Sequence, residues 1–205
     1  TLTSNGGAIF FDGTVDSLGA TNRGLTVNAG SGLTTFDAVV GNTDALGAII
    51  ISGSGGLDLN AAIGSGATAG ATSLAVTGAT ALGADVTTSG TQEYTGLVTA
   101  DVAAKRTLTG STITLTGGLD GGAQALDIAG DLVTGAAMTN ITVLDVSGTA
   151  SLGGSVTTAD SLTIDGTLTL TTNITLDSTG NDATDDITLA AISGTDGGAT
   201  ESLVL

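Results

Sequence analysis

Residues 74–88 read Leu-Ala-Val-Thr-Gly-Ala-Thr-Ala-Leu-Gly-Ala-Asp-Val-Thr-Thr, and residues 144–158 read Leu-Asp-Val-Ser-Gly-Thr-Ala-Ser-Leu-Gly-Gly-Ser-Val-Thr-Thr. The two stretches align without a gap. In each, aliphatic residues alternate with polar or small ones, the period of two that points successive side chains to opposite faces of a β-strand. Glycine then supplies a turn. Self-similarity of this kind is typical of a repeat architecture.

The same motif of a short strand followed by a turn recurs along the whole chain. Copies begin at Leu25, Ile49, Leu74, Ile113, Leu126, Leu144, Leu162 and Ile187. The widest gap, between Leu74 and Ile113, leaves room for one more coil around Tyr94. Residues 32–41 also align with residues 56–64, so longer coils of about 25 residues and shorter ones of about 18 residues occur in blocks.

These observations predict an all-β fold, a parallel β-helix or β-solenoid of about 9–10 coils of about 18–25 residues each. Strands of successive coils would stack in parallel about 4.8 Å apart. Aliphatic residues would form ladders inside the coil, and Thr and Asp would form ladders outside. The chain contains no Pro, as expected where every strand needs its N–H for a ladder bond. We interpret residues 1–205 as a single solenoid segment.

The charge and composition exclude several classes of function. Three basic residues face 20 acidic ones, for a net charge of −17, so nucleic-acid binding is not expected. The longest aliphatic run, residues 48–51, is far too short to span a membrane as a helix. An acidic surface instead keeps copies soluble and attracts cations.

Catalytic chemistry is hard to find in this sequence. There is no His and no Cys, so the usual nucleophile and general-base pairs are excluded and we expect no enzyme. Some parallel β-helices cleave polysaccharides with paired carboxylates. Asp127 and Asp145 share a coil position here, with Asp165 two positions further on, but solvation of one face is the favoured interpretation.

The only candidate metal ligands are three aspartates near the C-terminus, Asp182, Asp185 and Asp186. They lie in a segment, residues 177–186, with four Asp and one Asn, and oxygen donors of this kind suit Ca²⁺. The spacing does not follow an EF-hand, and a solvated loop is the favoured interpretation. No other cofactor is expected.

Arrays of outward Thr suggest a further alternative. Thr112, Thr114 and Thr116 alternate along one strand, as do Thr167, Thr169 and Thr171, and a flat Thr array can bind ice. Ordinary β-propensity also explains Thr on a strand surface. A Ca²⁺-stabilised or ice-binding solenoid module is therefore the alternative to a structural fibre.

Several strings resemble the repeats of filamentous-haemagglutinin-like bacterial exoproteins and adhesins, namely residues 25–32, 87–96 and 107–115. The resemblance implies a right-handed parallel β-helix and a role in attachment or fibre formation. It also implies a secreted, extracellular protein at the cell surface. The expected partners are copies of the chain joined end to end and glycans of a host or surface, with no nucleic acid and no membrane insertion.

The two ends of the chain predict that it is one period or fragment of a longer repetitive fibre. The sequence opens at Thr1 without Met, as expected of a piece of a longer product. Aligning the first coil with the second puts Phe11 on Phe36 and leaves the position of Leu25 unmatched. Leu205 of a preceding copy could fill that position, which predicts a direct junction between Leu205 and Thr1.

Overall fold

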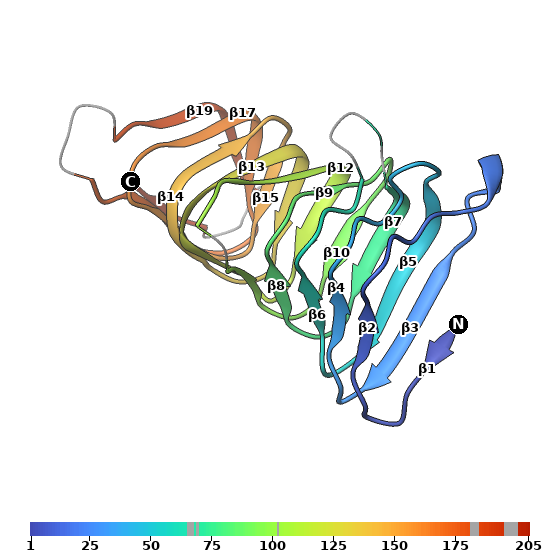
Figure 1. The fold of residues 1–205 in the computed structure, drawn as a ribbon. Helices are drawn as coiled ribbons and strands as arrows, with labels where there is room; N and C mark the ends of the chain where they lie inside the picture. The colour runs from blue at the N-terminus through green and yellow to red at the C-terminus, as the bar shows by residue number, and fades with distance from the viewer. Residues whose placement is uncertain (65–67, 69, 102, 181–184, 195–200) are drawn as a thin grey trace.

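A computed structural model describes residues 1–64, 68, 70–101, 103–180, 185–194 and 201–205. Every strand pair in these ranges is parallel and joins neighbouring coils, so the chain forms a β-solenoid of about nine turns. Figure 1 shows the stack running from the N-terminal coils in blue to the C-terminal coils in red. The predicted fold class and coil number are confirmed.

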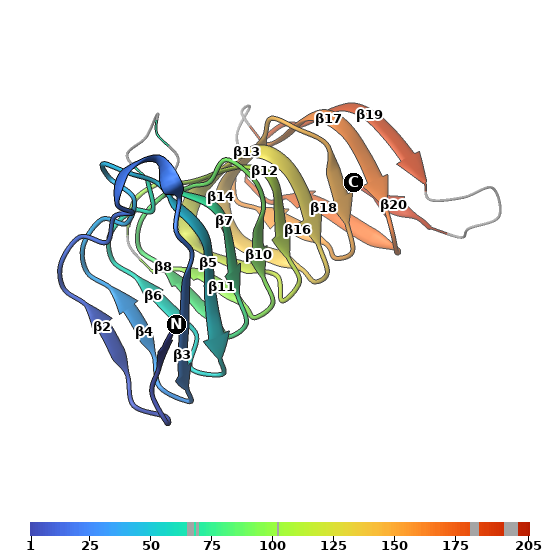
Figure 2. The same cartoon turned by 90° about the vertical axis from the view of Figure 1, so that its right-hand side faces the viewer.

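Each coil has three sides, which follow one another in the same order along the stack (Figure 2). We define the first side by Val27, the second by Phe36 and the third by Val40. The first side contains β1 (Leu2–Thr3), β3 (Leu25–Gly30), β5 (Leu46–Gly53), β7 (Ala71–Val76), β10 (Gln92–Tyr94) and β15 (Ala150–Leu152). The second side contains β2 (Ile9–Phe11), β4 (Thr34–Phe36), β6 (Leu57–Leu59), β8 (Thr80–Leu82), β11 (Val98–Ala100), β16 (Val156–Thr158), β18 (Ile174–Ser178) and β20 (Leu203–Val204).

The third side is built differently in the two halves of the stack. In the N-terminal half its residues form isolated bridges, with β9 (Val86–Thr87) as a short strand and a 3₁₀ turn, η1 (Gly19–Thr21), near its first corner. In the C-terminal half, long strands include the third side and continue around one or two corners onto the neighbouring sides. These are β12 (Arg106–Leu115), β13 (Leu119–Thr134), β14 (Met138–Val146), β17 (Leu162–Leu170) and β19 (Ile187–Gly194).

The register of the first side gives the length of each coil. The inward residues that stack on one another are Leu2, Val27, Ile51, Val76, Tyr94, Leu115, Thr134, Leu152, Leu170 and Gly194. Coils are about 24–25 residues long as far as Val76, about 18–21 residues from there to Leu170, and about 24 residues in the last step to Gly194. The predicted range of coil lengths and the additional coil at Tyr94 are confirmed. Long coils lie at both ends of the described stack and short ones in the middle.

The interior is a narrow core of stacked aliphatic rows. On the third side the buried row comprises Val40, Ile63, Val86, Leu108, Ile128, Val146 and Ile164. Burying a side chain of this size contributes roughly 1.5–3 kcal/mol, which is why the rows hold the coils together. Three polar residues interrupt the rows of the first side: Gln92 and Tyr94, which are fully buried, and Thr134, which is 4% exposed.

The repeated motif does not keep to one side of the coil. The copies at Leu25, Ile49, Leu74 and Ile113 lie on the first side, in one ladder that passes through Gln92. The copies at Leu126, Leu144, Leu162 and Ile187 form a ladder on the third side. The two most closely spaced copies, at Ile113 and Leu126, therefore lie within neighbouring sides rather than in one row. A copy of the motif therefore does not identify the side on which it lies, because the sides share the same local pattern.

This change of side also overturns the predicted junction of Leu205 with Thr1. In β20, Leu203 pairs with Ile174 and Val204 with Thr175 on the second side, which puts Leu205 in line with Leu176. The junction would need Leu205 on the first side, one coil after Ile192. Fewer residues separate Ile192 from Leu205 than separate any two residues that stack on the first side. A complete coil therefore does not fit between Ile192 and Leu205. The other part of that alignment is confirmed, because Phe11 pairs with Phe36.

Candidate functional site

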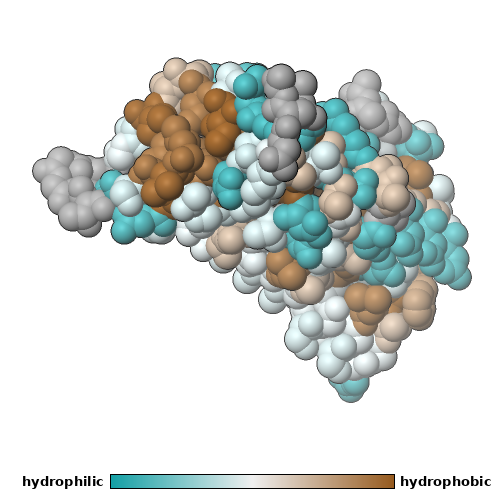
Figure 3. All heavy atoms as spheres, turned by 90° about the vertical axis from the view of Figure 1, so that its left-hand side faces the viewer, coloured by the Kyte–Doolittle hydropathy of each residue, from teal (hydrophilic) through white to brown (hydrophobic). Residues whose placement is uncertain are grey.

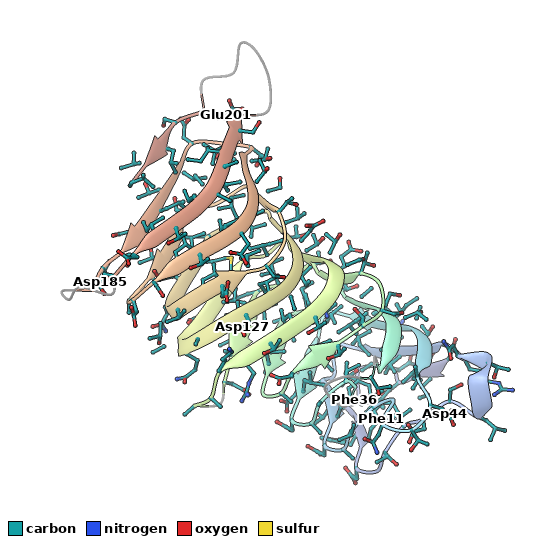
Figure 4. The ribbon with its side chains drawn as sticks, turned by 90° about the horizontal axis from the view of Figure 1, so that it is seen from above. Phe11, Phe36, Asp44, Asp127, Asp185 and Glu201 are labelled. Atoms are coloured by element: carbon teal, nitrogen blue, oxygen red, sulfur yellow. The ribbon has the colours of Figure 1, made fainter. Side chains whose placement is uncertain are left out.

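Polar side chains gather on the outward face of the third side, in the middle and C-terminal part of the stack. One outward column consists of Thr107, Asp127, Asp145, Thr163 and Thr188, each paired with the next. Asp127 and Asp145 are therefore neighbours on successive coils, as their shared motif position predicts. Asp165 directly follows Ile164 and lies outside this column. Figure 4 shows where Asp127 lies along the stack.

Lys105 places a positive charge beside this acidic column. Its Nζ forms an ion pair with the carboxylate of Asp127, and the two side chains are 57% and 29% exposed. The hydrogen bond to Asp127 and the charge of that residue raise the pKa of Lys105, and the charges of Asp145 and Asp85 act in the same direction. Because the pair is exposed, its contribution to stability is small. Its main effect is to neutralise part of a column of like charges.

A hollow of about 430 Å³ adjoins the column on the N-terminal side, lined among others by Ile63, Asp85, Thr87, Thr107 and Thr109. Its size falls at the low end of small-molecule sites. Asp85 is the one carboxylate in the described lining, and its Oδ1 accepts a hydrogen bond of 2.9 Å from the backbone N–H of Thr107. The lining thus offers hydroxyl groups and one engaged carboxylate, so it can form polar contacts rather than present an acid and a base.

Many of the carboxylates have a structural role that the sequence analysis missed. Oδ1 of Asp16 accepts from the backbone N–H of Thr43 at 2.8 Å, and Oδ1 of Asp131 accepts from that of Thr149 at 2.8 Å. Asp85 does the same for Thr107. In each pair the acceptor lies one coil before the donor, so the side chain extends the backbone ladder at a corner. The sequence signal that could have revealed this role is an Asp that precedes a Thr by about one coil length.

Asp120 shows a related arrangement within and between coils. Its Oδ1 accepts from the backbone N–H of Gly122 at 3.0 Å and from Nδ2 of Asn140 at 2.9 Å. These two hydrogen bonds lower the pKa of Asp120. The carboxylate therefore holds the turn at Gly122, whose φ is 57°, rather than facing a substrate.

The predicted Ca²⁺ ligands are not brought together by the described structure. Asp182 lies outside the described residues. The backbone oxygen of Asp186 accepts from the N–H of Leu162 at 2.9 Å, so that residue continues the ladder of the third side. Figure 4 labels Asp185 and Glu201 at separate places on the C-terminal coils. Within the described ranges, no three acidic side chains form a group that could hold a metal ion, and the Ca²⁺ site stays a prediction.

The predicted Thr arrays do not continue from coil to coil. Thr114 stacks between Glu93 and Val133 on the outward face of the first side. Thr169 stacks between Ser151 and Ser193. Ice binding requires the same Thr pair on successive coils, so these columns do not present the regular surface that the alternative function needs.

Comparison of the chain with known protein families, characterised proteins and solved structures found no match. Over the described ranges, no helix is both long enough and apolar enough to cross a membrane.

Proposed function

We propose that this chain is a structural and adhesive segment of a secreted, extracellular fibre at the cell surface, of the filamentous-haemagglutinin-like kind. Its coils would continue end to end onto another stack of the same type. The observation that carries this proposal is the apolar surface of the C-terminal coil.

That surface consists of core rows on which no described residue stacks. Ile192 continues the row of Leu168, yet it is 52% exposed while Leu168 is fully buried. Ile187, Leu189 and Leu203 pack only partly against the core. Figure 3 shows a hydrophobic area on this end of the molecule. An uncovered row of strands is a template for pairing, and one further coil would bury it.

The two ends of the described stack also have similar coils. The first and last coils of the first-side ladder are about 24–25 residues long, whereas those between Val76 and Leu170 have about 18–21 residues. Coils of equal length present cross-sections of similar size. A C-terminal coil is therefore suited to an N-terminal coil of another copy, in a head-to-tail contact that builds a filament.

The net charge of −17 supports contact at the ends rather than along the sides. Like-charged rods repel one another laterally over a screening length of about 10 Å at 0.1 M salt. The outward hydroxyl and carboxylate groups would remain free for polar ligands, such as glycans of a surface. No catalytic step is part of this proposal.

The filament proposal can be tested with one pair of variants. Electron microscopy and sedimentation over increasing protein concentration should show rods that lengthen without thickening. Ile192→Asp places a charge on the end surface and should abolish lengthening. Ile50→Asp is the matched control, because Ile50 is 41% exposed on the outward face of the first side, away from the end. Equal behaviour of both variants, or globular particles from the parent chain, would reject the proposal.

The adhesive part needs a separate measurement. Binding of the parent chain and of Ile192→Asp to a glycan array should be the same, because the outward columns are unchanged. If the chain binds no glycan on the array, the adhesive role is rejected and only the role as a fibre segment remains.

A further inference from the structure

The apolar pattern of this chain does not by itself determine which side of the coil a segment occupies. Residues 74–88 and 144–158 match without a gap, but Leu74 lies on the first side and Leu144 on the third. Both side chains are 1% exposed. A rotation of one part of the stack by one side would keep aliphatic residues inside, so the register needs another determinant.

Two buried polar residues on one strand, Gln92 and Tyr94, interrupt the first-side rows where the short coils begin. Gln92 stacks between Leu74 and Ile113, and Tyr94 stacks in the adjacent row between Val76 and Leu115. Neither Gln92 nor Tyr94 is exposed to solvent. A buried amide and a buried hydroxyl each require partners, so these positions can be satisfied only where acceptors face them.

The partners come from the third side of two successive coils. Tyr94 Oη donates to Gln92 Oε1 at 2.9 Å, and Gln92 Nε2 donates to the backbone oxygen of Thr109 at 2.8 Å and to that of Val86 at 3.2 Å. Val86 and Leu108 are paired neighbours in the third-side ladder. The Gln92 amide therefore joins the first side to the adjoining third side and ties two coils together.

The surroundings of this network are tightly packed. Thr88 Oγ1 lies 3.4 Å from Gln92 Nε2 and donates to the backbone oxygen of Gly90 at 3.0 Å. A Cβ on Gly110 would come within 2.7 Å of the Gly90 oxygen and 2.9 Å of Thr88 Oγ1. The network therefore has Thr88 beside it and a glycine, Gly110, one coil after Gly90.

The network also lies where the coil changes. The long coils end at Val76, and the short coils begin with the step from Val76 to Tyr94. The third side changes there from the isolated bridges of Val40 and Ile63 to the continuous strand β12. Two cross-sections meet at this coil, and repetition of the apolar pattern cannot align them.

We propose that Gln92 and Tyr94 lock the register in which the coil of Thr109 stacks on the coil of Gln92, at the start of the short coils. In a register rotated by one side, the backbone oxygen of Thr109 would no longer face the Gln92 amide, and the cost of burying this donor without that partner would disfavour the rotated arrangement. A buried polar group that sets register at the expense of some stability has precedent in coiled coils.

Disulfide reporters can measure the register, because the chain contains no Cys. Glu93 and Thr114 are outward neighbours on successive coils, at a separation that a disulfide can bridge. Glu93→Cys with Thr114→Cys therefore reports the observed register. Glu93→Cys with Asp120→Cys reports a rotated one, since Asp120 holds the corresponding place on the second side. Each pair is introduced into the parent chain and into the Gln92→Leu, Tyr94→Phe background.

In the parent chain, only the first reporter should form a disulfide. In the Gln92→Leu, Tyr94→Phe background the chain should keep its β-sheet circular dichroism, lose part of the first cross-link and gain the second. The control is Thr80→Val, which removes a buried hydroxyl without a hydrogen-bond partner. In this variant only the first reporter disulfide should form, as in the parent chain. An unchanged first cross-link in the double variant would overturn the proposal. Unfolding of the double variant would overturn it too, since the pair would then be needed for packing rather than for register.

Discussion

The ring of Phe11 stacks on the ring of Phe36 one coil later, with centroids 4.7 Å apart and planes 23° apart. Figure 4 labels both residues in the N-terminal coils. Their contact anchors the first coil, whose apolar residues are only partly buried. Phe36 is fully buried, whereas Phe10 points outward and is 63% exposed.

The Phe36→Ala variant should lower the free energy of unfolding by about 3–5 kcal/mol, because it removes a buried ring and its stacking contact with Phe11. Phe10→Ala is the matched control and should change it by less than about 0.5 kcal/mol. Urea denaturation followed by circular dichroism measures both. Equal losses would mean that the second-side strand β2 has its inward and outward faces reversed.

A charge placed in the third-side row should be severely destabilising. Val146 is fully buried, and Val146→Asp would bury a carboxylate among aliphatic neighbours at a cost of several kcal/mol, about the range measured for unpaired buried charges. Asp145→Asn changes the adjacent outward residue and should leave the melting temperature nearly unchanged. A Val146→Asp protein that melts with the parent would contradict the assigned core.

Glycines at the corner between the third and first sides stack closely on one another. A Cβ on Gly148 would lie 2.5 Å from the backbone oxygen of Gly130, whereas a Cβ on Gly13 would meet nothing within 4 Å. Gly148→Ala should therefore cost about 1–3 kcal/mol through overpacking, and Gly13→Ala should be neutral or slightly stabilising. Thermal unfolding of the two variants checks this, and a neutral Gly148→Ala would show that the corner can widen freely.

Alkaline pH should reveal the burial of Tyr94. Burial raises the pKa of its phenol above the ordinary value, so the folded state holds the proton more tightly than the unfolded chain. The associated stability is complete below the unfolded pKa of about 10 and is lost as pH rises through the folded pKa.

The chain has one Tyr and no Trp, so phenolate absorbance reports Tyr94 alone. In native protein it should emerge only together with the loss of β-sheet circular dichroism, while in denaturant it should titrate at about pH 10, the ordinary pKa of an exposed phenol. Phenolate that formed at this ordinary pH in a fully folded chain would show that solvent reaches the core at Gln92 and Tyr94.

The amino-acid sequence alone is enough to predict a solenoid, the range of its coil lengths and the additional coil at Tyr94. These conclusions follow from local features, because an alternating strand with a glycine turn has the same meaning wherever it occurs. The alignment of Phe11 with Phe36 was correct for the same reason: both lie in long coils with nearly the same spacing.

The side of the coil that each copy of the motif occupies emerges only when the coils are stacked. All three sides have a period of two, so the pattern is the same for Leu74 on the first side and Leu144 on the third. The site of the buried polar pair was equally hidden, and so were the backbone N–H groups that donate to Asp85 and Asp131. These contacts join residues one coil apart, and the length of a coil changes between the long and the short part of the stack. Their partners are therefore set by the stacking of the coils and not by any fixed spacing.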